Sequence, residues 1–401
     1  MSVVLLALEL VLGLLAATVL IPALLVTLQV LLALVPGRAR PVASGLRPQV
    51  AVLVPAHNEA AGIRATLQAI LDQLAAGDRV LVVADNCEDA TAAVAAATGA
   101  EVIERSDPIR RGKGYALDFG IRYLAEQAPT VVIIVDADCL VTPGSIDQLT
   151  RLAMVSQCPA QALYMMQAPP NASIKTPGIK TRIAEFAWMV KNQVRPLGSQ
   201  RLGLPCQLMG TGMAFPWALI SKATLANAEL VEDMKLGIDL ALAGHPPVFC
   251  ADALVTSQFP DSAAAAATQR TRWEHGHLGM ILAEAPRLLG QAVMRRNLKL
   301  LGLALDLAVP PLALLVALLM LLFAVSGGFF LAGFSFWPLL LSGLALGSLT
   351  LALLLAWLVW GRSVLPFGDL LSAPLYILGK APMYLKFWTK RQKEWVRTGR
   401  D

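Results

Sequence analysis

The sequence predicts an α/β domain with a mostly parallel sheet and helices on both faces, flanked by transmembrane helices. Three observations carry this prediction. Strand-like and helix-like segments alternate four times between residues 50 and 135, as they do in parallel sheets. The run VVIIV at 131–135 is wholly apolar, which is typical of a strand buried on both faces. Long apolar segments lie at both ends of the chain, whereas residues 48–290 have an ordinary globular composition.

The overall composition indicates a membrane protein. The 401 residues are 56% hydrophobic and 15% charged, and the formal net charge is +5. Basic residues gather beside the apolar segments, which favours a membrane surface over nucleic acid as the partner. The five cysteines contain no C-x-x-C pair. They predict free thiols in a reducing compartment rather than disulfides or a zinc site.

Residues 1–35 are predicted to contain the first transmembrane helix, because 3–35 is almost wholly apolar and long enough to span a bilayer. A signal peptide is disfavoured, since the segment is too long and lacks a basic start and a small-residue cleavage site. Pro22 predicts a kink or the end of a turn. The linker 36–49 contains Arg38, Arg40 and Arg47, which places this side of the membrane in the cytoplasm.

Each predicted strand is followed by a loop that carries polar side chains. The strands are expected at 50–54, 80–84, 101–104 and 131–135, and the helices at about 60–74, directly after 85–91, and at 115–126. Asn58 and Glu59 follow the first strand, Asp85 the second, Lys113 the third, and Asp136 with Asp138 the fourth. Because strand-end loops of a parallel sheet share one edge, these groups should converge.

The converging groups fit a nucleotide diphosphate. Two carboxylates spaced as Asp136 and Asp138 form a hard oxygen site at which Mg²⁺ can bridge protein and phosphate. Lys113 can neutralise the diphosphate, and the acidic and amide groups can bind a ribose or a base. The alternative is an ordinary turn, where Asp is common. The chain has no P-loop and no G-x-G-x-x-G after the first strand, so a dinucleotide cofactor is not expected.

Seven motifs occur in one order across residues 48–290. They are PAHNE at 55–59, ADNCEDAT at 84–91, RGKG at 111–114, VDADC at 135–139, GTGM at 210–213, Glu232-Asp233, and Q-x-x-R-W at 269–273. In this order they resemble the family 2 glycosyltransferases, whose nucleotide-binding domain has the GT-A fold. Q-x-x-R-W resembles the membrane-integrated branch, which includes cellulose, chitin and hyaluronan synthases and ceramide glucosyltransferase.

The resemblance implies an inverting enzyme that uses a nucleotide sugar, most often a UDP-sugar, and Mg²⁺ or Mn²⁺. Asp136 and Asp138 would hold the metal, Asp85 the base, and Asp233 with Glu232 would form the catalytic pair. The implied nucleotide-sugar site consists of Pro55, Asn58, Glu59, Asp85, Lys113, Asp136, Asp138, Gln269, Arg272 and Trp273. The implied acceptor site consists of Gly210, Thr211, Gly212, Met213 and Trp273.

The chemistry of the reaction favours some of these roles, while several of the residues also have structural alternatives. Inverting transfer needs one base for the acceptor hydroxyl, and Asp233 is a candidate. Carboxylates also favour helix N-termini for dipole reasons, which is the alternative for Glu232. Gln269, Arg272 and Trp273 share one helix face, but Arg and Trp are also common membrane-interface anchors.

Several other polar residues have open interpretations. His275 and His277 lack further ligands at metal spacing, so packing at the surface or in the acceptor groove is favoured over a metal site. The basic residues scattered over 171–204 have two interpretations. They form a solvated face, which is slightly favoured, or they contact anionic lipid or a lipid-linked diphosphate. The residues of this set are Lys175, Lys180, Arg182, Lys191, Arg195 and Arg201.

The C-terminal third is predicted to be membrane-embedded. A span is expected at Leu300–Val325, an external turn at Ser326–Phe336, and a second span at Leu339–Trp360. Asp306 within the first span predicts a functional or paired acid, or one at the interface. Residues 365–388 are expected to lie on the membrane surface, followed by a basic tail.

The predicted division is therefore as follows: 1–35 transmembrane helix, 36–49 linker, 50–260 cytoplasmic transferase domain, 261–298 interfacial helices, 299–361 two transmembrane helices, and 362–401 interfacial segment and cytoplasmic tail. The N-terminus is expected outside a bacterial inner membrane. Three spans favour single transfer to a lipid or lipid-linked saccharide in glycolipid or exopolysaccharide assembly. The alternatives are a processive polysaccharide synthase, whose channel would need an oligomer or partner subunit, and a non-catalytic nucleotide-sugar-binding protein.

Overall fold

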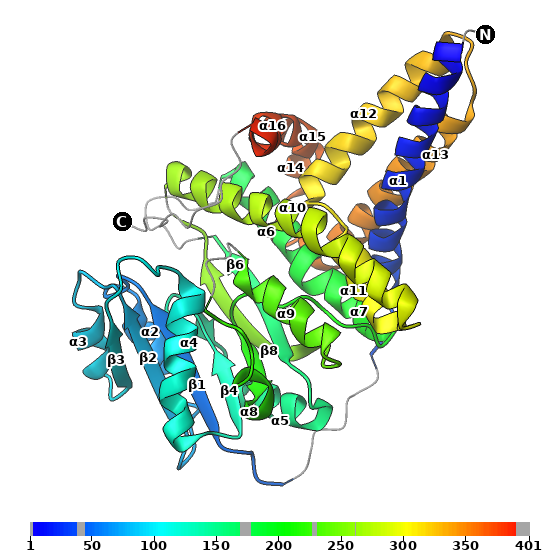
Figure 1. The fold of residues 1–401 in the computed structure, drawn as a ribbon. Coiled ribbons are helices and arrows are strands. Elements are labelled where there is room, and N and C mark those ends of the chain that lie inside the picture. Colours follow the sequence, from blue (N-terminus) through cyan, green and yellow to red (C-terminus); the bar gives the residue numbers. More distant parts are fainter. Residues whose placement is uncertain (1–2, 38–44, 169–177, 227–230, 261, 390–401) are drawn as a thin grey trace.

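The computed structural model describes residues 3–37, 45–168, 178–226, 231–260 and 262–389. Figure 1 shows an α/β domain and a projecting group of three long helices, α1, α12 and α13. The predicted fold class is confirmed, because the domain contains an eight-stranded mixed sheet with helices on both faces.

The strands of the sheet follow the order β3-β2-β1-β4-β7-β6-β8-β5. Their bounds are β1 Val50–Ala56, β2 Arg79–Asp85, β3 Glu101–Arg105, β4 Val131–Ile134, β5 Leu140–Val141, β6 Ala160–Gln167, β7 Met213–Pro216 and β8 Val248–Gln258. The first four strands pair in parallel, as the strand–helix alternation predicts. The strand β7 pairs antiparallel with both β4 and β6, so the second half of the sheet is mixed.

Two apolar layers hold the domain together. On one face, α2 (Ile63–Leu71), α3 (Thr91–Ala96) and α5 (Ser145–Ser156) pack on the sheet. On the other face lie α4 (Lys113–Leu124), α8 (Trp217–Ile220) and α9 (Glu232–Leu242). All four residues of β4 are fully buried, because alternate side chains enter the two layers.

A long helical segment connects the domain to the membrane helices. It consists of α6 (Ile179–Met189), the π-helical turn η2 (Val190–Val194) and α7 (Arg195–Arg201). Pro196 lacks the N–H that an α-helix would use at this point, which favours the wider π-helical turn just before it. The helix α10 (Ala263–Met294) then crosses above the sheet, and α11 (Leu298–Leu307) packs against it.

Among the described residues, three helices are long and apolar enough to cross a membrane: Leu6–Ala33 of α1, Leu312–Leu331, and Trp337–Gly361. The full bounds are α1 Val3–Ala33, α12 Leu312–Leu331, and α13 Trp337–Ala356 with the π-helical turn η3 Trp357–Gly361. The three helices pack side by side (Figure 1). The helix α1 continues through Pro22.

The span expected at Leu300–Val325 is wrong in its extent. Pro310 and Pro311 interrupt it, because proline cannot continue a helical hydrogen-bond ladder. Residues 298–307 instead form α11, outside the three candidate spans, and α12 extends to Leu331. The expected external turn, Ser326–Phe336, is therefore shorter, since its first half is helical.

Asp306 belongs to a buried polar cluster where α1 meets the domain. Its carboxylate accepts hydrogen bonds from Arg195 (2.7 Å), from Gln29 of α1 (2.7 Å) and from Gln207 (2.6 Å). Beside this cluster, α1 and α7 meet backbone to backbone: a Cβ added to Gly198 would lie 1.9 Å from the Gln29 carbonyl oxygen. The paired arrangement expected for Asp306 is thus present.

The last described segment consists of three short helices, α14 (Phe367–Leu371), α15 (Ala373–Leu378) and α16 (Ala381–Thr389). Ion pairs connect Asp369 to Arg182 of α6 (2.6 Å) and Lys380 to Glu274 of α10 (2.8 Å). The basic tail beyond Thr389 lies outside the described residues, as do Arg38, Arg40 and Lys175.

Candidate functional site

The strand-end loops converge as expected. They border a cavity of about 590 Å³, here called the strand-end cavity. Its lining includes the predicted residues Pro55, Asn58, Glu59, Asp85, Lys113, Asp136, Asp138, Gln269 and Arg272. The parallel half of the sheet explains this convergence, because β1, β2, β3 and β4 all end at one edge.

Asp85 is buried at the end of β2 and is held in a fixed position. Its carboxylate pairs with Arg105 (2.6 Å) and accepts a hydrogen bond from Asn86 (3.0 Å). The Asp85 carbonyl oxygen lies 2.7 Å from Nδ1 of His57. A carboxylate fixed in this way can accept a hydrogen bond from a base without a further ordering cost.

Asn58 and Glu59 shape the loop after β1. Asn58 has a φ of +55°, and its side chain accepts a hydrogen bond from the backbone N–H of Glu88 (2.7 Å). The backbone N–H of Glu59 donates to Thr91 (2.8 Å). These bonds connect the loops after β1 and β2, so Asn58 has a structural role in the geometry of the cavity.

Asp136 and Asp138 meet the requirements of a divalent-cation site. Oxygen atoms of both carboxylates and Sγ of Cys139 lie within 4.8 Å of one another. Burial raises the pKa of the Cys139 thiol to about 12, so the thiol stays protonated at neutral pH. The donors that remain are carboxylate oxygens, which Mg²⁺ and Mn²⁺ prefer.

Lys113 connects the two carboxylate groups of the site. Its ammonium pairs with Asp136 and lies 3.9 Å from Glu232. It also donates to the carbonyl oxygen of Gly210 (2.7 Å). Burial opposes the charged form, but Asp136, Glu232 and Asp233 outweigh that effect and raise the Lys113 pKa above its ordinary value. Lys113 is therefore a permanent cation between these carboxylates.

A second cavity of about 220 Å³ lies next to the first and is here called the central cavity. The two share five lining residues, namely Lys113, Asp136, Asp138, Gln269 and Arg272. The central cavity adds the predicted residues Gly210, Glu232, Asp233 and Trp273. The structure thus brings the strand-end residues, the acidic pair and the Q-x-x-R-W residues together around one volume.

Glu232 and Asp233 form the first turn of α9. Burial raises the pKa of both carboxyl groups, and the nearby Lys113 ammonium opposes this increase. For Glu232 the result is a pKa of about 7. Two adjacent carboxyl groups with raised pKa values are suited to accepting a proton near neutral pH.

Gln269, Arg272 and Trp273 all lie on one face of α10 and line the central cavity. Trp273 packs on Trp188 with ring centroids 5.1 Å apart, and Trp188 contacts Tyr164 edge to face at 5.4 Å. Trp273 does not line the strand-end cavity. Its expected contact with the nucleotide sugar is thus restricted to the part that reaches the central cavity.

The residues of the expected acceptor loop lie at different depths in the structure. Of its four residues, only Gly210 lines the central cavity. Thr211 is fully buried and accepts a hydrogen bond from the backbone N–H of Asp136 (3.1 Å). Gly212 packs against Ala162, and Met213 begins β7 inside the sheet. These three residues are packed inside the domain, because the loop continues directly into the buried strand β7.

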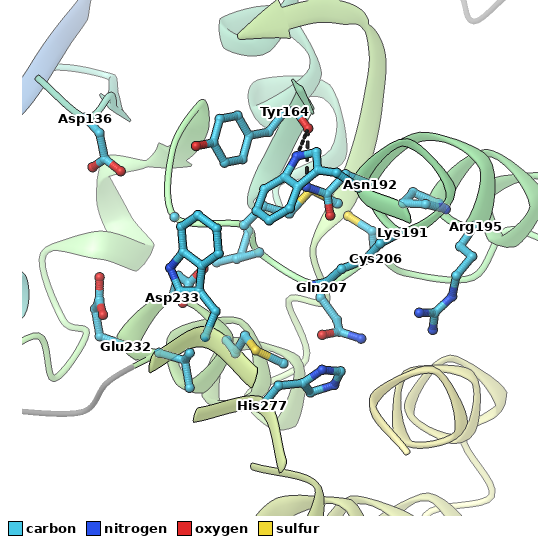
Figure 2. Close-up of a pocket in the computed structure, with 18 of the residues that line it drawn as sticks. Asp136, Tyr164, Lys191, Asn192, Arg195, Cys206, Gln207, Glu232, Asp233 and His277 are labelled. Carbon is cyan, nitrogen blue, oxygen red and sulfur yellow. Dashed lines mark hydrogen bonds between the residues drawn. The ribbon is translucent and has the colours of Figure 1, made fainter. Parts of the chain in front are cut away.

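Four residues that line the central cavity were not expected there from the sequence, namely Tyr164, Trp188, Asn192 and Gln207. Four others had open interpretations and also line it, namely Lys191, Arg195, His277 and Asp306. Figure 2 shows Asp136 and Glu232 on one side of the cavity and Lys191, Arg195 and Gln207 on the other. The histidine has the expected packing role: His277 is buried, and its Nε2 lies 3.3 Å from the Leu307 carbonyl oxygen.

A third cavity, here called the apolar cavity, has a volume of about 200 Å³ and reaches the candidate membrane spans. Val26 of α1, Leu312 and Val316 of α12, and Leu353 of α13 line it. It shares a border with the central cavity, formed by Trp188, Lys191, Arg195, Gln269, Trp273 and His277. The three cavities therefore lie next to one another between the strand ends and the candidate membrane spans, and each shares lining residues with the next.

Comparison with known proteins agrees with this geometry. The family model described as glycosyltransferase-like family 2 matches residues 48–276. The chain is 39% identical over 194 residues to an uncharacterized glycosyltransferase of Mycobacterium tuberculosis, covering 46% of this chain and 82% of that protein. It is 28% identical over 246 residues to the probable glycosyltransferase YdaM of Bacillus subtilis. That match covers 59% of this chain, which spans only 56% of the relative's length.

A solved structure shares the fold. It is the mannosyltransferase PcManGT of Pyrobaculum calidifontis, determined in complex with GDP-Man and Mn²⁺. The TM-score is 0.51 at 18% sequence identity, and the match covers 86% of this chain and 99% of that protein. The structural match covers more of the chain than the family match does. The structural match includes 86% of the chain, whereas the family match, residues 48–276, includes about 57%.

Proposed function

Because the chain belongs to glycosyltransferase-like family 2, we propose that it is an inverting enzyme that transfers a sugar from a nucleotide sugar to a lipid or lipid-linked saccharide. The proposed donor is a UDP-sugar, bound in the strand-end cavity. The proposed location is a bacterial inner membrane with the α/β domain in the cytoplasm, which fits the basic residues flanking the candidate spans.

One observation carries this proposal: the three cavities adjoin one another through shared lining residues. The strand-end cavity suits a polar nucleotide, and the apolar cavity is lined by side chains of all three candidate membrane spans. Asp233 and Trp273 lie in the central cavity between them. A lipid entering from the membrane side and a nucleotide sugar entering from the strand ends would meet at these residues.

The reaction can be assigned to residues of this chain. Asp233 would take the proton of the acceptor hydroxyl while the acceptor oxygen bonds to the anomeric carbon of the sugar. The bond from that carbon to the diphosphate breaks, and its electron pair leaves with the diphosphate. Lys113 and Arg272, which line both the strand-end and central cavities, would balance the negative charge that develops there.

Asp136 and Asp138 would hold the divalent cation. When bound, Mg²⁺ or Mn²⁺ would act as a Lewis acid on the departing diphosphate. The fit rests on the two carboxylates at the strand end and on a neighbouring thiol that stays protonated. Lys113 already pairs with Asp136 and would share the negative charge of the site with the cation.

The proposal is tested by donor turnover. The purified full-length protein in detergent is given Mg²⁺ or Mn²⁺, membrane lipids and a panel of UDP- and GDP-sugars, and release of nucleoside diphosphate is measured. We expect release from one UDP-sugar, abolished by EDTA and by Asp138→Asn. The matched control is Asp239→Asn, an exposed carboxylate on α9, which should leave the rate unchanged.

Two results would contradict the proposal. One is the absence of release from every donor in the presence of lipid, and the other is release that continues in EDTA. The size of the product separates the proposed reaction from the alternative of a processive synthase, since a single transfer to a lipid yields no polymer.

A further inference from the structure

The apolar cavity carries an excess of positive charge. Four cationic side chains line it, against the single carboxylate of Glu274. Two of the four are neutralised: Arg195 pairs with Asp306 (2.7 Å) and Lys380 with Glu274 (2.8 Å). The other two are Lys191 and Arg270. Within the described residues, neither of these has an ion pair or a side-chain hydrogen bond.

Lys191 occupies an unusual position for a lysine. It lies in the π-helical turn η2, and such turns are frequent at functional sites. It is exposed, and it borders both the central and the apolar cavity. Its ammonium lies over the ring of Trp188 at 5.6 Å, and Trp188 in turn packs on Trp273. Lys191 thus lies at the junction of the two cavities, as does Arg195, but Arg195 is paired with Asp306.

The surroundings do not neutralise Lys191. The protein around the cavity desolvates its ammonium and lowers its pKa, and the neighbouring Arg195 lowers the pKa further, while Asp233 and Asp306 act in the opposite direction without restoring the ordinary value. A cation in this position is stabilised by an anion that enters the cavity. The phosphate is the anionic group that membrane lipids most commonly present, and lysine and arginine bind it well.

We propose that the acceptor is an anionic lipid, whose phosphate is bound by Lys191 together with Arg270 and whose chains occupy the apolar cavity. This inference rests on the proposed function and narrows its acceptor class. Charge and lining agree on one occupant, because the cavity wall contains two cations without an ion pair, Lys191 and Arg270, together with Val26, Leu312 and Val316 of the candidate spans. A neutral lipid would leave both cations without a counter-charge, and free phosphate would leave the apolar wall uncovered.

The binding test uses dioleoyl phosphatidic acid and dioleoylglycerol, which have the same chains and differ in the phosphate. Each is titrated in neutral detergent micelles into the full-length protein, and retained lipid is counted by native mass spectrometry. We expect about tenfold or greater preference for phosphatidic acid. Lys191→Met should abolish most of the preference, and Lys191→Arg should retain part of it.

The matched control is Lys222→Met, because Lys222 is exposed and lines none of the three cavities. It should keep the full preference. Equal binding of the two lipids would overturn the proposal, and so would a preference that survives in the Lys191→Met, Arg270→Met double variant. Displacement of phosphatidic acid by an equal concentration of inorganic phosphate would overturn the assignment to a lipid.

A second measurement addresses the acceptor itself. With labelled donor and a membrane lipid extract, the product lipid should be retained on an anion-exchange resin. Label in the neutral lipid fraction would overturn the proposal. Failure of the proposed function is recognisable separately, because it removes the labelled product and the release of nucleoside diphosphate while leaving the lipid-binding result intact.

Discussion

The two ends of the cavity series are built in different ways. The strand-end cavity is formed by short loops that each follow a strand of one parallel sheet, so residues close in sequence perform related tasks. The apolar cavity is formed by helices far apart in the chain, from Val26 of α1 to Lys380. The first is therefore stabilised by the sheet itself, whereas the second exists only once the membrane helices are packed against α6 and α10. Variants at the two ends should consequently fail in different ways.

The largest effect is expected where the two ends meet. Asp233→Asn removes the proposed base, and the turnover number should fall by about 10²- to 10⁴-fold. The binding of nucleoside diphosphate, measured by calorimetry, should be retained, because the strand-end cavity does not include Asp233. Loss of nucleotide binding in Asp233→Asn would show that Asp233 also contributes to the nucleotide site, contrary to the expected separation of the strand-end cavity from the base.

A buried pair dominates the stability of the membrane end. Asp306→Asn leaves Arg195 buried without its counter-charge, which typically costs about 3–5 kcal/mol. We expect a lower midpoint of thermal unfolding in detergent and a loss of the junction with α1. The exposed pair Lys235–Asp239 offers the comparison, since Asp239→Asn should shift the midpoint little. Equal shifts of the unfolding midpoint in Asp306→Asn and Asp239→Asn would contradict a special contribution of the buried ion pair to stability.

A smaller and more selective effect is expected at the strand end. Asp85→Asn removes a charged acceptor beside the nucleotide, worth about 1.5–3 kcal/mol, so the donor KM should rise by about 10- to 100-fold. The KM for the lipid should not change, because Asp85 lines the strand-end cavity alone. Initial rates measured with each substrate varied in turn give the KM for the donor and the KM for the lipid separately. A similar increase in both values would contradict separate donor and lipid sites.

The smallest effect concerns pH. Burial, with Lys191 and Arg195 nearby, lowers the pKa of His277 to about 3, against about 6.5 in an unfolded chain. The unfolded state therefore binds the extra proton between these values, and His277 makes the folded protein less stable as pH falls from about 6.5 towards 3. His277→Gln should show a shallower decline in unfolding midpoint between pH 7.5 and 5. An unchanged slope would exclude this contribution.

The same contrast explains what could be predicted from the sequence. Asp136 and Asp138 follow a wholly apolar run, so their place at a strand end is a local property of the chain, and the fold class follows from four repeats of that pattern. The antiparallel insertion of β7 between β4 and β6 has no such local signal. The burial of Thr211 and Met213 has no local signal either, because it depends on how the loop before β7 packs in the folded domain.

The membrane end was harder to predict for the same reason. Lys191 and Arg195 are four residues apart in a segment with many basic residues, and only the packing of α11 reveals that one is paired with Asp306 and the other is not. The proline pair at 310–311 was the available signal that the expected span should be divided. Hydropathy alone conceals that break, because the residues on both sides are apolar.

The close contact at Gly198 has a consequence for the evolution and engineering of this protein. Since the backbones of α1 and α7 touch there, the first helix is not an interchangeable anchor that could be exchanged for another hydrophobic segment. If α1 spans the membrane as proposed, its contact with α7 would set the distance between the bilayer and the proposed catalytic pair, Glu232 and Asp233. The reach of a headgroup, as well as its chemistry, would then decide which lipids are modified.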